Sequence, residues 1–286
     1  MRSNSKRCGD SMHTGTVYLV GAGPGDPELL TVKARKLLDS ADAVLHDRLA
    51  DDRIVDSCSD AAEIISVGKR PGPNGERTTQ EEIHHLLVRK AREGKDVVRL
   101  KGGDPTVFGR GGEEAEHLAA AGIDFEIVPG ISSAVAGPGV AGIPVTHRDH
   151  ASCVTVVTGH EDPTKPESAL DWDALSATVQ AGGTLVILMG VGKLPENMAA
   201  LRAGGVSDDT PVAMVERATR DDEFTVTGTL ETIVERRDEV GIEPPAVTVV
   251  GDVVSVRDNV IEYLQGAPSV GFAPAPETAV SDRGVE

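Results

Sequence analysis

The sequence predicts an α/β protein of two domains, the first built on a mostly parallel sheet and the second on a mixed sheet. Short apolar runs with strand character alternate with segments of helical spacing along most of the chain. Such alternation is typical of strands joined by helical crossovers. The 286 residues are also enough for two ordinary domains with sizeable cores.

The expected elements of the first domain follow one another in regular order. Short apolar runs predict buried strands, and a 3.6-residue period predicts helices. Thr79 is followed three residues later by Glu82, which is the signature of a capping box at the start of a helix. We expect strands at 16–20, 43–45, 64–67, 97–100 and 125–128, and helices at 29–38, 79–93 and 113–121.

The second domain repeats the alternation without repeating the sequence. Residues 224–229 alternate between apolar and polar side chains, which favours an antiparallel strand at a sheet edge. We expect the other strands at 154–158, 184–189, 211–216 and 246–250, and helices at 172–181, 194–203 and 231–240.

The domain boundary is expected in the Gly/Pro-rich stretch 141–151. This choice gives a first domain at 16–145 and a second at 151–266. Residues 1–15 and 267–286 show no periodic pattern, and we expect both to be disordered extensions.

Charge and composition exclude several classes of partner. The formal net charge is −18, and only 2% of residues are aromatic. An acidic surface repels phosphate backbones and scarce aromatic rings leave few stacking platforms, so we expect no nucleic-acid partner. The acidic excess on an ordinary globular composition also predicts a protein adapted to concentrated salt, that is, a halophilic one.

Apolar and cysteine patterns narrow the setting further. No apolar run approaches the roughly 20 residues that span a bilayer, and the polar residues 1–13 lack the core of a signal peptide. We therefore expect a cytoplasmic protein with no membrane partner. Cys8, Cys58 and Cys153 form no CxxC pair, so neither a disulfide framework nor a metal site is indicated.

Three glycine-rich segments follow expected strands. GAGPGD at 21–26 departs from the dinucleotide-binding spacing, and its Asp26 would repel a phosphate, so we expect a loop without phosphate preference or a structural turn. KGGDPTVFGRGGEE at 101–114 exposes its backbone beyond a strand end, where α/β sheets bind ligands. PGISS at 129–133 offers serine hydroxyls and free amides to a ligand, or a simple helix N-cap.

Charged residues gather after other strand ends, at 46–48 (HDR), 69–70 (KR) and 146–150 (THRDH). Each cluster alone is typical of a solvated surface. Together they would bring one carboxylate and several cations to a common cleft. This mixture suits a base that acts on a substrate rich in carboxylates, because arginine binds carboxylates through two hydrogen bonds.

Seven motifs together resemble one family. The sequence is similar to the tetrapyrrole methylases, of the type that methylates uroporphyrinogen III, from about residue 16 to residue 266. The motifs are VGAGPGD at 20–26, VGKR at 67–70, RLKGGDP at 99–105, FGRGGEE at 108–114, VPGI at 128–131, GIPVTHR at 142–148 and VTGH at 157–160.

The resemblance implies a fold, a cofactor and a reaction. It implies two α/β domains with the active-site cleft between them, a homodimer, and S-adenosyl-L-methionine as methyl donor, with S-adenosyl-L-homocysteine as product. The implied reaction is two methyl transfers to uroporphyrinogen III, giving precorrin-2 for sirohaem or cobalamin. By position, the implied cofactor contacts are Pro24, Gly102, Gly103, Asp104, Val107, Ser132, Ser133, Met189 and Ala218.

The resemblance also assigns two catalytic positions. Asp47 matches the family's proton acceptor and Lys69 its proton donor. The family commonly has a tyrosine where this chain has His46, and a glycine where it has Ala218. The candidates for binding the substrate's acetate and propionate groups are Lys69, Arg48, Arg70, Arg110, His147 and Arg148.

Other hypotheses about the function of this sequence stay open at this point. A methylase of the same family that acts on a later corrin intermediate is the nearest alternative. More distant relatives would methylate RNA or a modified histidine, and the acidic charge opposes RNA. A non-catalytic nucleotide-binding module is the alternative from a different class, because fold alone does not determine function.

Overall fold

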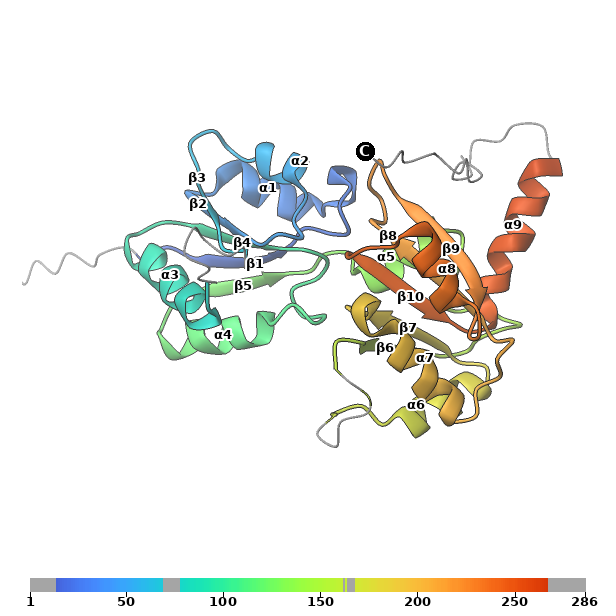
Figure 1. Ribbon diagram of the computed structural model, residues 1–286. Coiled ribbons are helices and arrows are strands. Elements are labelled where there is room, and N and C mark those ends of the chain that lie inside the picture. Colours follow the sequence, from blue (N-terminus) through green and yellow to red (C-terminus); the bar gives the residue numbers. More distant parts are fainter. Residues whose placement is uncertain (1–13, 69–77, 162, 164–167, 267–286) are drawn as a thin grey trace, which may run out of the picture. The chain divides into compact units, whose positions relative to one another are not determined.

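The computed structural model describes residues 14–68, 78–161, 163 and 168–266. The chain divides into two compact units, residues 1–131 and 132–286 (Figure 1). Of the extensions expected at 1–15 and 267–286, residues 1–13 and 267–286 lie outside the described residues. Gly15, which was expected to belong to the first extension, donates its backbone N–H to the carbonyl oxygen of Ala91 at 2.9 Å.

The first unit is built on a five-stranded sheet in which every strand pair is parallel. The strand order is β3-β2-β4-β1-β5. The strands are β1 (Val17–Gly21), β2 (Ala43–His46), β3 (Glu63–Ser66), β4 (Val97–Lys101) and β5 (Phe125–Val128). The parallel sheet expected from the alternating pattern is confirmed.

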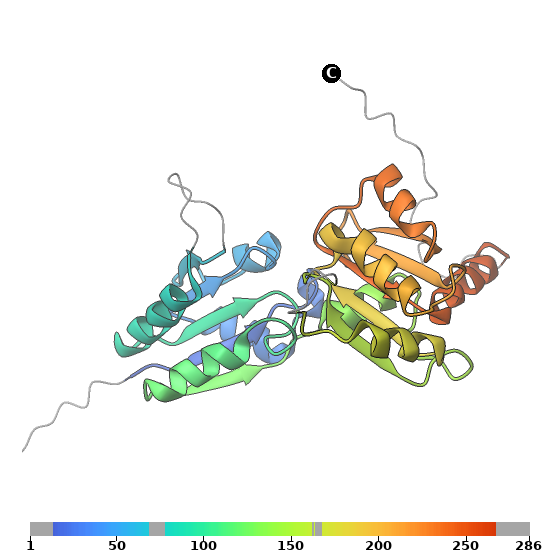
Figure 2. The ribbon, with the colours of Figure 1, turned by 60° about the horizontal axis from the view of Figure 1, so that its bottom comes forward.

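Helices cover both faces of this sheet (Figures 1 and 2). One face packs against α1 (Val32–Ser40) and α2 (Asp52–Asp56), and the other against α3 (Gln80–Arg92) and α4 (Gly111–Ala120). The two faces receive alternate residues of each strand. The expected capping box starts α3, because Thr79 and Glu82 exchange hydrogen bonds of 2.6 and 3.2 Å.

Strands β1 and β4 lie side by side, yet the helices that follow them lie on opposite faces of the sheet. The loop after β1 therefore turns towards α1, and the loop after β4 turns towards α4. In an open parallel sheet such a switch point opens a crevice at the carboxyl ends of the strands, where ligands bind. The fold therefore predicts a ligand site at the loops after β1 and β4.

The second unit contains a five-stranded mixed sheet in the order β6-β7-β10-β8-β9. Its strands are β6 (Val154–Thr158), β7 (Thr184–Leu188), β8 (Pro211–Glu216), β9 (Phe224–Thr229) and β10 (Ala246–Val250). Only β6 and β7 pair in parallel. Strand β9 is antiparallel to β8 at the sheet edge, as its alternating sequence predicts.

Helices of the second unit also pack on the sheet. The apolar core involves α6 (Trp172–Gln180), α7 (Leu194–Ala203) and α8 (Ile233–Val240). Helix α5 (Ser133–Val140) contacts β7, β8 and β10. Because α5 packs on these strands, the division between the units falls at residue 131, ahead of the expected boundary stretch 141–151.

Helices α2 and α9 (Ser255–Gly266) were not expected from the sequence, whereas α5 begins at the helix N-cap considered for PGISS at 129–133. Helix α2 is a single short turn of five residues, too brief for a periodic pattern. Among the described residues, no helix is both long enough and apolar enough to cross a membrane.

Candidate active site

Three loops at the carboxyl edge of the first sheet touch through glycines. The loops after β1 and β4 form an antiparallel bridge in which Gly23 and Gly103 exchange backbone hydrogen bonds of 2.8 and 3.1 Å. A Cβ atom on Gly130, in the loop after β5, would lie 2.3 Å from the oxygen of Gly103 and 2.7 Å from the Cα of Gly21. Only glycine allows this approach, so the three expected glycine-rich loops form one assembly.

Asp104 fastens this assembly. Its Oδ1 accepts hydrogen bonds from the backbone and hydroxyl of Thr106 at 2.8 and 2.6 Å, and its Oδ2 accepts one from the N–H of Gly130 at 3.0 Å. Burial by itself raises the pKa of Asp104, but the hydrogen bonds from Thr106 and Gly130 outweigh it and lower the pKa. Asp104, expected to contact the cofactor, thus shapes two of the loops through its carboxylate.

The loop after β4 keeps an unusual backbone. Phe108 and Arg110 both have positive φ, at 53° and 59°, a left-handed conformation that costs energy for residues with side chains. The guanidinium of Arg110 pairs with the Glu113 carboxylate through hydrogen bonds of 2.8 and 2.6 Å, which raise its pKa. Arg110 is therefore at the rim of this loop, bound to an exposed carboxylate.

The predicted proton acceptor lies in the loop after β2, at the same edge of the sheet. Asp47 Oδ1 accepts backbone hydrogen bonds from Leu49 at 3.0 Å and Ala50 at 3.2 Å. Its Oδ2 lies 3.9 Å from Nη2 of Arg99, and the side chain is 26% exposed. The carboxylate is thus held by its own loop and still reaches the surface.

Neighbouring loops bring further predicted residues to this edge. Val67, after β3, donates its N–H to the carbonyl of His46 at 2.9 Å. Gly68 lies against Arg48, because a Cβ atom there would be 2.5 Å from the Arg48 Cγ. The predicted proton donor Lys69 and the substrate candidate Arg70 lie outside the described residues.

Strand β4 and α4 hold charges that the sequence analysis did not assign. Arg99, Lys101 and Glu114 are each at most 4% exposed and form a buried ion cluster. A signal was present in the sequence, since VVRLK places two cations at alternate positions of an otherwise apolar strand. The arginine of this cluster is the one that faces Asp47.

Four of the predicted cofactor residues lie in the second unit. Ser132 caps α5 by accepting a hydrogen bond from the N–H of Ala134 at 3.3 Å, and Ser133 is the first residue of that helix. Met189 follows β7 with a φ of 57° and is 54% exposed, whereas Ala218 follows β8 and is buried. Strands β7 and β8 both run antiparallel to β10, so these two residues leave the same edge of the sheet.

Two substrate candidates share a tight loop of the second unit. His147 and Ala151 form an antiparallel bridge, and the Nδ1 of His147 accepts the N–H of Asp149 at 3.1 Å. His147 is half-buried and tilted against His150, with ring centroids 4.8 Å apart. Arg148, between them, is exposed. Of this pair, Arg148 offers its charge to the surface.

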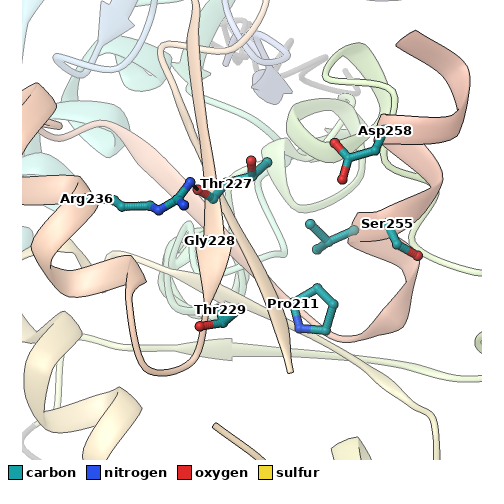
Figure 3. A pocket seen from close by; sticks show the side chains of 8 residues that line it. Pro211, Thr227, Gly228, Thr229, Arg236, Ser255 and Asp258 are labelled. Atoms are coloured by element: carbon teal, nitrogen blue, oxygen red, sulfur yellow. Dashed lines mark hydrogen bonds between the residues drawn. The ribbon is translucent and has the colours of Figure 1, made fainter. Parts of the chain in front are cut away.

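The structure also contains a pocket that holds none of the predicted site residues (Figure 3). Its volume is about 290 Å³, and Arg236 of α8 and Asp258 of α9 approach it from different sides. Arg236 already donates to the carbonyl of Thr227 at 2.7 Å.

In the described part of the chain, no three His, Cys, Asp or Glu side chains are grouped so as to hold a metal ion.

The fold and the three touching glycine loops agree with a known family. The family model described as Tetrapyrrole (Corrin/Porphyrin) Methylases matches residues 16–234. The chain belongs to the tetrapyrrole methylase family.

Individual relatives define the resemblance more closely. The chain is 56% identical over 252 residues to the S-adenosyl-L-methionine-dependent uroporphyrinogen III methyltransferase of Methanosarcina barkeri, covering 88% of this chain and 97% of that protein. It is 49% identical to the uroporphyrinogen-III C-methyltransferase of Methanocaldococcus jannaschii, covering 86% and 99%. The solved uroporphyrin-III C-methyl transferase of Thermus thermophilus, complexed with S-adenosyl homocysteine, has a TM-score of 0.71 and 42% identity, covering 85% and 100%.

Proposed function

We propose that this chain methylates uroporphyrinogen III twice, with S-adenosylmethionine as methyl donor, and so forms precorrin-2. The observation that carries the proposal is the meeting of three glycine loops beside Asp47 at the carboxyl edge of a parallel sheet. The 56% identity to the Methanosarcina barkeri uroporphyrinogen III methyltransferase supports the choice of substrate.

The residues present suit a methyl donor that carries no phosphate. The backbone is bare at Gly102 and Gly103, and the loop after β1 presents Asp26 rather than a cation. We assign contacts with S-adenosylmethionine in the first unit to Pro24, Gly102, Gly103, Asp104 and Val107, and in the second unit to Ser132, Ser133, Met189 and Ala218. Asp104 would contribute mainly by shaping the loops, since its oxygens already accept three hydrogen bonds.

The chemistry needs alignment and a base. A ring carbon of the electron-rich macrocycle forms a bond to the sulfonium methyl as the sulfur–methyl bond breaks, S-adenosylhomocysteine leaves, and the macrocycle loses a proton to restore neutrality. The protein contributes to the rate mainly by holding the ring carbon, the methyl group and the sulfur in line. Asp47 is exposed enough to accept that proton, and Lys69 is the proposed proton donor.

Basic side chains would bind the substrate's carboxylates. We assign this role to Arg48, Arg70, Arg110, His147 and Arg148, because arginine forms paired hydrogen bonds with a carboxylate. Arg110 would exchange its contact with Glu113 for a substrate group.

The test is an anaerobic methyl-transfer assay with labelled S-adenosylmethionine and freshly prepared uroporphyrinogen III. We expect two methyl groups per macrocycle, and a loss of about 100-fold or more in kcat for Asp47→Asn, in the range set by loss of a general base. The matched control is Asp56→Asn, which alters an exposed carboxylate of α2. Full activity of Asp47→Asn would remove the base assignment.

A later corrin intermediate is the second candidate substrate. A solved cobalt precorrin-4 methyltransferase has a TM-score of 0.74 and 31% identity to this chain. Binding of S-adenosylhomocysteine without transfer to uroporphyrinogen III would favour that substrate. We also propose a homodimer, which light scattering of the purified protein would test.

A further inference from the structure

Strand β4 carries two charged side chains in the interior of the first unit. Its side chains alternate between the two faces, so Val97, Arg99 and Lys101 all point towards α3 and α4. Arg99 is 4% exposed and Lys101 is 3% exposed. Buried cations are costly unless they are paired and hydrogen-bonded, so the fold must supply acceptors at this point.

Glu114 of α4 is the acceptor that the two cations share. It is fully buried and lies one helical turn before the core residue Leu118, on the side of α4 that faces the sheet. Its Oε1 accepts hydrogen bonds from Arg99 Nε at 3.2 Å and from Lys101 Nζ at 3.0 Å. Lys101 also reaches Oε2 at 3.0 Å, and Gln80 donates to Oε1 at 3.1 Å. Glu114 is thus fixed from several directions.

This buried cluster has one positive charge in excess, because two cations share one carboxylate. Burial, and next to it the charge of Arg99, lower the pKa of Lys101. Within the described residues, the other carboxylate that comes within 4 Å of Arg99 is Asp47, whose Oδ2 lies 3.9 Å from Nη2. Asp47, which is partly exposed, is therefore the carboxylate that faces the excess positive charge of the buried cluster.

The guanidinium of Arg99 has little freedom to turn away. Its Nε is bound to Glu114, and its Nη1 donates to the carbonyl oxygens of Leu45 at 3.4 Å and Leu100 at 3.0 Å. These contacts leave Nη2 directed at Asp47. The sheet register pairs Arg99 with Leu45, two residues before Asp47, so β2 and β4 together determine this distance.

Asp47 presents its two oxygens differently. Its own loop occupies Oδ1 through the N–H groups of Leu49 and Ala50, while Oδ2 faces Arg99. We propose that Arg99 is a positioning residue that orients the Asp47 carboxylate, and that Glu114 and Lys101 in turn hold Arg99. The proposal rests on the proposed role of Asp47 as the base, and Arg99 itself does not touch the reactants.

A double-mutant cycle tests the proposal. We compare Arg99→Met in the wild-type protein and in the Asp47→Asn variant, and measure kcat, the KM for S-adenosylmethionine and methyl transfer to uroporphyrinogen III. In the wild-type background we expect kcat to fall about 10- to 100-fold, the usual effect of a misplaced catalytic group, with that KM changed less than about twofold. In the Asp47→Asn background we expect a further fall of less than about threefold, because coupled residues are not additive.

The matched control is Lys90→Met. This lysine is also buried, pairs with Glu63 at 2.8 Å, and lies at the opposite end of the sheet strands, since Glu63 begins β3. We expect it to lower the thermal midpoint without lowering kcat. Should Arg99→Met fail to fold, Arg99→Lys keeps the buried charge but cannot make all the contacts of a guanidinium, and the same cycle applies.

The outcomes separate the two proposals. Equal fold losses in both backgrounds, or a kcat for Arg99→Met and Arg99→Lys equal to that of Lys90→Met, would overturn the positioning role. Full activity of Asp47→Asn would instead overturn the base assignment on which the inference rests. Binding of S-adenosylhomocysteine, measured by calorimetry on each variant, establishes that the first unit remains folded.

Discussion

Replacing Gly130 with alanine places a methyl carbon where three loops already touch. The new Cβ would lie 2.3 Å from the Gly103 oxygen and 2.7 Å from the Gly21 Cα, well inside ordinary van der Waals contact. These neighbours are backbone atoms, which cannot swing aside as a side-chain tip can. The loop after β4 would have to retreat by about 1 Å, a typical consequence of overpacking.

The expected loss of stability can be worked out from the hydrogen bonds that the substitution would strain. A retreat of the loop strains the pair between Gly23 and Gly103, at 2.8 and 3.1 Å, and the 3.0 Å bond from Gly130 to Asp104. Each such bond contributes about 1 kcal/mol. We therefore expect the free energy of unfolding to fall by about 3 kcal/mol, near the upper end for overpacking.

Urea unfolding and calorimetric titration with S-adenosylhomocysteine measure the effect. Because the strained loops are proposed to contact the cofactor, we expect its affinity to fall at least about tenfold, equivalent to about 1.4 kcal/mol. Gly112→Ala is the control, since a Cβ there meets nothing within 4 Å and the residue lies in α4. If Gly130→Ala matched Gly112→Ala in both stability and affinity, the interlocked-loop argument would be refuted.

Three further predictions concern charge. Hydrogen bonds lower the pKa of Asp104 in the folded protein. The stability that the Asp104 carboxylate contributes is therefore present above its pKa in the unfolded chain, and is lost as pH falls through its pKa in the folded protein. In urea unfolding, we expect Asp104→Asn to be less stable than the wild type by about 1–2 kcal/mol at pH 7, and this difference in unfolding free energy to close below about pH 4. A difference that did not change with pH would contradict this expectation. The net charge of −18 predicts a higher thermal midpoint in molar KCl, and equal midpoints would remove the salt-adaptation hypothesis. Arg148→Ala should raise the KM for uroporphyrinogen III about fivefold or more without changing S-adenosylhomocysteine affinity, whereas the exposed Arg202→Ala should not.

The sequence predicted most elements because their patterns are local. Apolar runs such as 17–21 and 184–188 are buried strands whichever neighbours they pair with, and the capping box at Thr79 depends on two residues three apart. The helices that the sequence analysis missed have other causes. Helix α2 is too short to show a period, and α9 follows a single 3-10 turn close to the unpatterned tail.

The candidate site was predicted unevenly. The glycine loops and the cluster at 46–48 were found because they follow expected strands, and the family resemblance added the role of Asp47. The structure brings the loops after β1, β4 and β5 together. The buried cluster of Arg99, Lys101 and Glu114 was not assigned any role. The alternate cations of VVRLK were a signal that Arg99 and Lys101 share one face of a strand, but charged residues ordinarily lie on surfaces and nothing local in the sequence places Glu114 against them.

By itself the sequence determined the fold class, the order of strands and helices along the chain, and the motifs of the tetrapyrrole methylase family. All of these depend on side-chain periodicity and on residues close together in the chain. The tertiary structure alone decided the strand order β3-β2-β4-β1-β5, which sets the loops after β1 and β4 side by side. It also decided that Arg99 faces Asp47 across the register of β2 and β4, because contacts between residues 52 positions apart arise only when the strands pair.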